Sequence, residues 1–164
     1  MDISNTTNPE FQWQCTNKAL GRFYTYYTIT DSRNICPAGW HVPTDDDWTA
    51  LTTYLINNGY AYKGQGDLVA KSLAAQSGWI ADTTAGNVGN DQQSNNSTGF
   101  TAYPTGGRIY TGVLEFVGLH AIHWSSTESS PTSAYFRCIG YIPGAVFRGT
   151  FKKSYGLPVR CIQD

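Results

Sequence analysis

The amino-acid sequence predicts an α+β domain, in which helical segments precede a run of short strands. Apolar residues recur at helical spacing between Trp48 and Leu55, and a second apolar stretch covers about 66–76. From Gly99 onward, short aromatic and β-branched segments alternate with turns rich in glycine, proline and serine. Strands and helices do not alternate along the chain, so we do not expect a parallel sheet.

The N-terminal region predicts one strand. Residues 20–29 are rich in aromatic residues and threonine, which favour an extended conformation. Residues 1–19 are more polar and irregular, and we assign them to a tail or an edge segment. The folded domain is then expected to span residues 20–164, which is long enough for one core.

The clearest predicted element is a helix that begins after Pro43. Thr44 is a favourable N-cap, and Asp47 three residues later completes a capping box. The acids Asp45–Asp47 could suggest a calcium cluster, but acids in a first helical turn also complement the helix dipole. We therefore interpret them as capping residues, and Asn57–Gly59 as the end of the helix.

A second helix is expected over about 66–76, followed by a long loop. Its apolar face would be formed by Leu68, Val69, Leu73 and Ala74. Residues 82–98 are mostly glycine, asparagine, glutamine, serine and threonine, which predicts a surface loop. Asp82 and Asp91 are its only carboxylates, too few for a typical calcium site. We expect no metal ion and no cofactor.

The second half of the chain predicts six short strands. Their expected ranges are 100–103, 107–110, 122–126, 134–141, 145–151 and 157–162.

The charge distribution argues against nucleic acid and membrane partners. The net charge is −1, and no apolar run is long enough to cross a bilayer. The region 100–163 nevertheless has a local balance of +4. Its bases could favour an anionic partner, but arginines on strands often brace loops, and we favour that second interpretation.

Several motifs resemble those of a C-type-lectin-like domain. They are Cys36–Thr44 (CPAGWHVPT) near the start, His123–Glu128 and Ala134–Arg137 later, and Val159–Cys161 at the end. The family that they resemble most is the Fibrobacter succinogenes major paralogous domain, over about 20–164. The resemblance implies two helices, a twisted antiparallel sheet and long loops. It also implies a structural role for His41.

The resemblance further implies that Cys36 and Cys161 form a disulfide bond. The chain has two more cysteines, Cys15 and Cys138, and no Cys-x-x-Cys pair, so a zinc ribbon is not expected. Cys15 and Cys138 could form a second bridge, and the alternative is two buried thiols.

The segment 136–153 contains nine residues that a randomised asparagine codon could encode. If the adenines of an asparagine codon were replaced at random, none of the products would be Lys, Glu, Gln, Met or Trp, and none of these occurs at the nine positions. This pattern resembles the variable proteins of diversity-generating retroelements. The alternative is drift in an exposed strand, which would give the same absence about one time in seven at ordinary residue usage. The nine positions are Cys138, Gly140, Ile142, Pro143, Ala145, Phe147, Gly149, Thr150 and Phe151.

These patterns predict a recognition module without catalysis. We expect it on a bacterial cell surface or a phage virion, where it would bind a protein or glycan receptor. The N-terminus lacks a secretion signal, so we expect either a signal already removed or export without one. The binding residues would be the nine variable positions together with His120, His123 and Tyr141. All but Cys138 of the nine should be mostly exposed on one side, and Trp124, Ile139, Val146 and Val159 mostly buried.

Two alternatives remain. The first is an oxidase-type enzyme related to the formylglycine-generating group. Those enzymes use a pair of reactive cysteines on late strands, and Cys138 and Cys161 are late cysteines. The second alternative is a structural surface domain without a small-molecule ligand. His120 and His123 are three residues apart, but on an expected strand and without a partner glutamate they do not form a metal motif.

Overall fold

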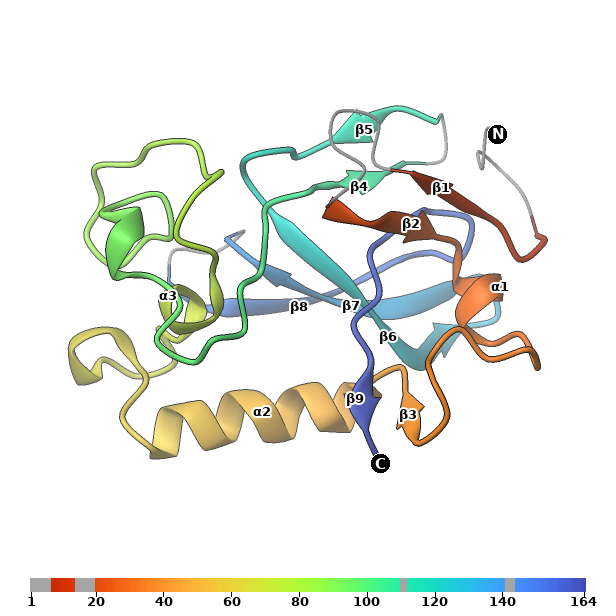
Figure 1. Ribbon diagram of the computed structural model, residues 1–164, viewed down its shortest axis with the longest axis horizontal. Coiled ribbons are helices and arrows are strands. Elements are labelled where there is room, and N and C mark those ends of the chain that lie inside the picture. The colour runs from red at the N-terminus through yellow and green to blue at the C-terminus, as the bar shows by residue number, and fades with distance from the viewer. Residues whose placement is uncertain (1–6, 14–19, 110–111, 141–143) are drawn as a thin grey trace.

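The computed structural model describes residues 7–13, 20–109, 112–140 and 144–164. They form a mixed α+β structure with short helices and several small antiparallel sheets, which confirms the predicted class (Figure 1). The helical elements are α1 (Tyr26–Ile29), α2 (Asp45–Asn57), η2 (Tyr62–Gly64), α3 (Ala70–Leu73) and η3 (Gln92–Ser94). The strands are β1 (Phe11–Trp13), β2 (Arg22–Tyr24), β3 (Trp40–His41), β4 (Gly107–Arg108), β5 (Leu114–Glu115), β6 (Ala121–Ser130), β7 (Ser133–Ile139), β8 (Val146–Lys152) and β9 (Ile162–Gln163).

The central sheet has the order β6-β7-β8, with antiparallel neighbours. Ile122 pairs with Cys138, and Cys138 pairs with Phe147, so these three side chains share one face of the sheet. This face belongs to a core cluster that includes Tyr26, Trp124 and Leu157. The opposite face packs against α2 and α3 in a second cluster (Figure 1). Both faces of the sheet are thus at least partly covered.

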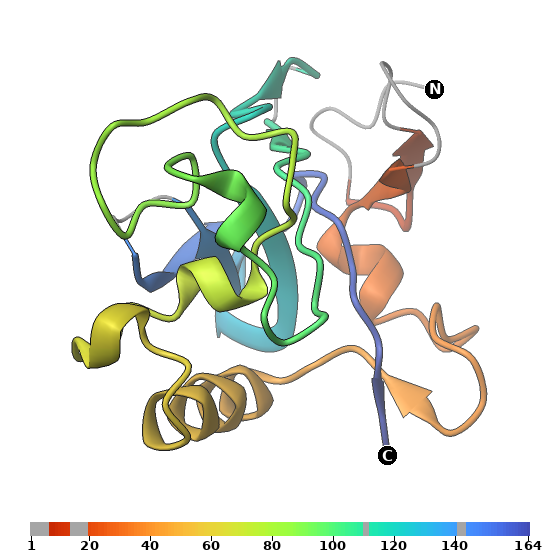
Figure 2. The same ribbon diagram turned by 60° about the vertical axis from the view of Figure 1, so that its left-hand side comes forward.

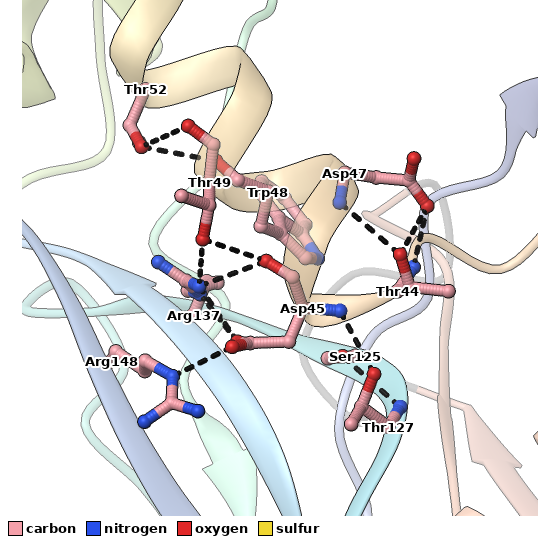
Figure 3. Close-up of polar contacts among 10 residues, drawn as sticks. All are labelled: Thr44, Asp45, Asp47, Trp48, Thr49, Thr52, Ser125, Thr127, Arg137 and Arg148. Carbon is pink, nitrogen blue, oxygen red and sulfur yellow. Dashed lines mark hydrogen bonds and ion pairs between the residues drawn. The ribbon is translucent and has the colours of Figure 1, made fainter.

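Helix α2 begins with the predicted capping box. Thr44 Oγ1 accepts a hydrogen bond from the Asp47 amide, and the Asp47 carboxylate accepts one from the Thr44 amide. Asp45 has a different role, because its carboxylate binds Arg137 of β7 and Arg148 of β8, both at 2.7 Å (Figure 3). The predicted bracing role of arginines is confirmed for these two, which tie the start of α2 to the sheet.

The second helix is shorter than predicted. The prediction covered about 66–76, but α3 spans only Ala70–Leu73. Ala74 is already extended, because its neighbours exchange hydrogen bonds with Ala102: Ala102 N–H donates to Leu73, and Ala75 N–H donates to Ala102. Pairing with a distant segment therefore overrides the local helical pattern.

The loop after α3 is organised around a lysine. The Lys71 side chain is 6 % exposed, and its ammonium donates hydrogen bonds to the carbonyl groups of Asn87, Asn90 and Asp91. Burial lowers the pKa of Lys71. The centre of this loop therefore contains a cation supplied by the chain itself.

The predicted strand 20–29 is only partly correct. Residues Arg22–Tyr24 form β2, which pairs with β1, but Tyr26–Ile29 turn into α1. The Tyr26 hydroxyl donates to the Ser126 carbonyl, and its ring meets Trp124 edge to face at 5.7 Å. These contacts with β6 favour a turn inward over continued extension.

Two further predicted strands are largely absent. Residues 100–103 form one bridge, between Ala102 and Ala74, and residues 157–162 form one bridge from Leu157 to Tyr24 before β9 begins at Ile162.

A disulfide bond joins Cys36 to Cys161, as the family resemblance implied. Their Cα atoms are 5.8 Å apart, and the pairing of β3 with β9 brings the same two regions together (Figure 2). Cys15 lies outside the described residues, so the second predicted bridge stays a prediction. No helix in the described ranges is long and apolar enough to cross a membrane.

Candidate functional site

The candidate site is an open aromatic groove beside the edge strand β8, which we call the β8 groove. Its volume is about 320 Å³. This lies at the lower end of the roughly 300–1,000 Å³ typical of ligand sites. It is lined by Phe116, His120, Ile122, Phe136, Cys138, Phe147, Gly149, Thr150 and Phe151.

The strand register places most of these residues together. Phe147, Gly149 and Phe151 alternate along β8 and point to the same face of the sheet. Their partners across the pairing are Cys138, Phe136 and Ala134, on the same face of β7. The groove is therefore a direct consequence of the β7–β8 pairing.

Aromatic stacking forms the walls of the β8 groove. The rings of Phe136 and Phe151 stack with centroids 4.2 Å apart, and Phe116 stacks on His120 at 4.9 Å. Burial lowers the pKa of His120, which favours its neutral form. Among the described residues, no acidic, lysine or arginine side chain lines the groove. Its chemistry is that of uncharged ring faces, which pack well against apolar groups and C–H edges.

Gly149 sets the depth of the β8 groove. A Cβ atom placed on Gly149 would lie 2.6 Å from the Phe136 ring and 2.7 Å from the Phe147 ring. Any side chain at this position would have to displace one of these rings. The residue at position 149 therefore controls how open the groove floor is.

The structure brings six of the predicted binding residues into the β8 groove and leaves others outside it. Those inside are His120, Cys138, Phe147, Gly149, Thr150 and Phe151. Tyr141, Ile142 and Pro143 lie outside the described residues.

Gly140 and Ala145 are not freely exposed, contrary to the prediction. Ala145 is 8 % exposed. Gly140 has a φ of 99°, and a Cβ atom there would lie 2.5 Å from the Leu119 carbonyl oxygen. A position with this conformation and this contact does not readily accept a side chain.

The prediction of mostly exposed groove positions was also wrong. Only Thr150 is exposed, whereas Phe147, Gly149 and Phe151 are half-buried; Cys138, which the prediction excepted, is buried. The rings cover one another and the glycine between them, which reduces their exposure. Among the residues expected to be buried, Trp124 and Ile139 are, while Val146 and Val159 are half-buried.

His123 lies on the opposite face of the sheet, so its predicted place beside the groove was wrong. Its ring stacks on Trp48 of α2 at 5.8 Å and meets Phe100 edge to face. Neither ring nitrogen has a hydrogen-bond partner among the described residues. Burial, and secondarily the charge of Arg160, lower the pKa of His123 to about 3.

The polar residues near His123 in sequence have other partners. Ser125 is fully buried, and its hydroxyl accepts a hydrogen bond from the Thr127 amide (Figure 3). The Glu128 carboxylate accepts one from Lys153 at 2.7 Å. Cys161 is bonded to Cys36, so it is not available as the cysteine partner of Cys138 that the oxidase alternative requires.

The sequence reasoning missed three groove residues: Phe116, Ile122 and Phe136. Ile122 and Phe136 could have been found from the strand alternation. Ile122 lies two residues from Trp124, and Phe136 lies two residues from Cys138, so each shares a face of the sheet with that residue. Phe116 precedes β6 in a turn, and nothing local in the sequence places it there.

These features define a small α+β domain that is closed by the Cys36–Cys161 disulfide bond and has an aromatic groove at its sheet edge. The chain matches the model of the Fibrobacter succinogenes major domain over residues 4–163, so it belongs to that family. No match to a curated protein or to a solved structure was found.

Proposed function

We propose that this domain recognises a protein or glycan receptor through the β8 groove, without catalysis. The observation that carries the proposal is the position of the groove: it contains five of the nine positions that sequence reasoning assigned to binding. Those positions were chosen within one segment, 136–153, as the residues between the family's frame positions that fit a randomised asparagine codon. Their convergence on one open cavity supports a shared role.

The chemistry of the β8 groove suits recognition. Phe147 and Phe151 present rings that are half-buried and held by neighbouring rings, so little side-chain entropy is lost when a ligand docks. Because the groove is uncharged, it favours the apolar face of a sugar ring or an apolar side chain of a protein. Among the described residues, its titratable lining side chains are His120 and Cys138.

We further propose that the fold is C-type-lectin-like and that the domain is displayed outside the cell, on a bacterial surface or a virion. The Cys36–Cys161 disulfide bond is compatible with an oxidising location. We also propose that a diversity-generating retroelement varies the groove. Five groove positions fit the codon pattern, and Gly149 illustrates how one substitution would reshape the floor.

The binding proposal is tested with arrays of glycans and of bacterial surface proteins. The labelled wild-type domain should bind a specific subset of the array. Gly149→Leu, which fills the floor, and Phe151→Ala, which removes a wall, should each weaken that binding at least tenfold. Thr132→Leu, which adds the same side chain on the exposed β6–β7 turn, should leave it unchanged. Equal binding by wild type and both groove variants would refute the role of the groove.

The retroelement proposal has an independent test in DNA. A near-copy of the 3′ coding end, with adenines at the nine positions and a reverse transcriptase gene nearby, is the expected result. A genomic neighbourhood with neither feature would contradict it.

A further inference from the structure

A second cavity lies on the other side of the central sheet from the β8 groove. Its volume is about 230 Å³, and we call it the His123 cavity. The residues that matter here are His123 on β6, Arg160 before β9, and Thr101, Tyr103, Thr105 and Val159 around them. None of them lines the β8 groove.

The His123 ring is an unsatisfied polar group in this cavity. It is only 8 % exposed, and both Nδ1 and Nε2 lack a hydrogen-bond partner in the described part of the chain. Buried polar side chains in native proteins are almost always hydrogen-bonded, and exceptions call for an explanation such as a missing ligand. The aromatic neighbours Trp48 and Phe100 hold the ring in position, and neither forms a hydrogen bond with it in the described part of the chain; the Trp48 Nε1–H group also lacks an acceptor there.

Arg160 is a cation without an anion in the same cavity. No carboxylate within residues 7–13, 20–109, 112–140 and 144–164 lies within 4 Å of its guanidinium. Among the described residues, its guanidinium stacks on the face of Phe100, 4.0 Å from the ring centroid. Asp47 lines a neighbouring cavity with Arg160, but its carboxylate engages Thr44 and His41. Burial lowers the pKa of Arg160, as expected for a guanidinium that has lost water without gaining a counter-ion.

We propose that the His123 cavity binds a small carboxylate, which accepts hydrogen bonds from the Arg160 guanidinium and from the N–H group of the His123 ring. Such a ligand would satisfy both groups at once, because carboxylate and guanidinium match in geometry and charge. This site is distinct from the receptor groove, and its existence does not depend on the proposed function.

The residues that line the His123 cavity restrict the class of ligand that it can bind. Beside the two polar groups lie apolar surfaces from Tyr103, Pro158 and Val159. An anion with a short apolar tail fits this combination better than inorganic phosphate. The volume of about 230 Å³ also suits a small free acid rather than a drug-sized molecule.

One wall of the cavity is already fixed. The Asn96 side chain donates to Thr101 Oγ1 at 2.8 Å and accepts from the Thr101 amide at 2.7 Å. A ligand therefore meets a wall that does not have to be ordered on binding, which favours affinity.

The experiment is a titration of the whole domain with butyrate, followed by NMR of the histidine ring nitrogens. We expect a saturable shift of the His123 signals with butyrate, and none with butanamide, which has nearly the same shape without the charge. Inorganic phosphate should bind at least tenfold more weakly than butyrate. No saturable shift, an equal response to butanamide, or tighter binding of phosphate would each overturn the proposal.

Variants at position 160 test whether the Arg160 guanidinium binds the carboxylate. Arg160→Gln should weaken butyrate binding at least tenfold, and Arg160→Lys should recover part of it. Arg33→Gln removes an exposed guanidinium elsewhere and should change nothing. Unchanged binding in a folded Arg160→Gln would contradict the proposal. If Arg160→Gln does not fold, the comparison of butyrate with butanamide in the wild-type domain decides whether the cavity binds a carboxylate.

Discussion

Replacing His123 by phenylalanine should change how the stability of this domain depends on pH. The ring is buried between Trp48 and Phe100, and its pKa is lowered from 6.5 to about 3. The folded state therefore keeps His123 neutral, while the unfolded chain protonates it below its ordinary pKa. Because the folded pKa is the lower one, the stability from neutral His123 is complete above about pH 6.5 and is lost as the pH falls toward 3.

The change in the free energy of unfolding follows from the one proton that His123 binds in the unfolded state. Between these two pKa values the unfolded state binds one more proton than the folded state, so the free energy of unfolding changes by about 1.4 kcal/mol per pH unit. Between about pH 7 and about pH 4.5, His123 should thus account for a loss of about 2 to 3 kcal/mol. His123→Phe keeps an aromatic ring between Trp48 and Phe100 and removes this titration.

The assay is urea denaturation of both proteins across this pH range, in buffers without carboxylic acids. The wild-type domain should lose about 2 to 3 kcal/mol more than His123→Phe as the pH is lowered. His41→Gln, measured from about pH 6 to about pH 9, is the control of opposite sign. Asp164 and Asp47 raise the pKa of His41, so its contribution is complete below about pH 6.5 and is lost as the pH rises through the folded pKa. Parallel pH profiles for wild type and His123→Phe would refute the buried neutral ring.

Three further predictions concern stability. Replacing both Cys36 and Cys161 by alanine opens a loop of 125 residues and should cost about 5 kcal/mol in urea denaturation; a loss below about 1 kcal/mol would contradict the loop-closure account. Asp45→Asn leaves the nearly buried Arg137 without its charge partner and should cost about 3 kcal/mol. Arg148→Met, at the exposed end of the same network, should cost less than about 1 kcal/mol, and equal costs would argue against the buried pair as the main term. Lys71→Met should speed hydrogen exchange throughout 82–98, because three carbonyl groups lose their donor; unchanged exchange would show that the loop does not depend on the ammonium.

Features encoded within a few residues were predictable. The capping box of α2 needs only Thr44 and Asp47, and the structure has it where the sequence placed it. The disulfide bond was implied by the family motifs around Cys36 and Cys161, since no local spacing could have paired residues so distant in the chain.

Features decided by distant contacts were not predictable. Residues 74–76 have helix-compatible side chains, but the pairing of Ala74 with Ala102 makes the chain extended at Ala74 and ends the helix. Likewise, Tyr26 continues an aromatic, strand-like pattern, yet its contacts with Trp124 and Ser126 turn the chain into α1. In both cases the deciding partner is many residues away.

About half of the candidate site could be predicted, because the alternation of side chains along a strand determines which residues share a face. Alternation alone gathers Phe147, Gly149 and Phe151 on one face, and the structure confirms that arrangement. The same rule separates Ile122 from His123, so treating His123 as a groove residue ignored a constraint that the sequence already contained. The burial of the groove positions, in contrast, depends on ring stacking that only the folded sheet reveals.

The disulfide bond also has a mechanical consequence. Under tension applied between the N-terminal side of Cys36 and the C-terminal side of Cys161, the load passes directly through the S–S bond. The residues between the two cysteines, separated by 125 positions, are then shielded from extension. At about 3.5 Å per residue, roughly 400 Å of chain cannot be drawn out while the bond is intact. The β8 groove lies wholly inside this shielded segment, so a pull along the chain would not by itself unravel the surface that we propose for binding.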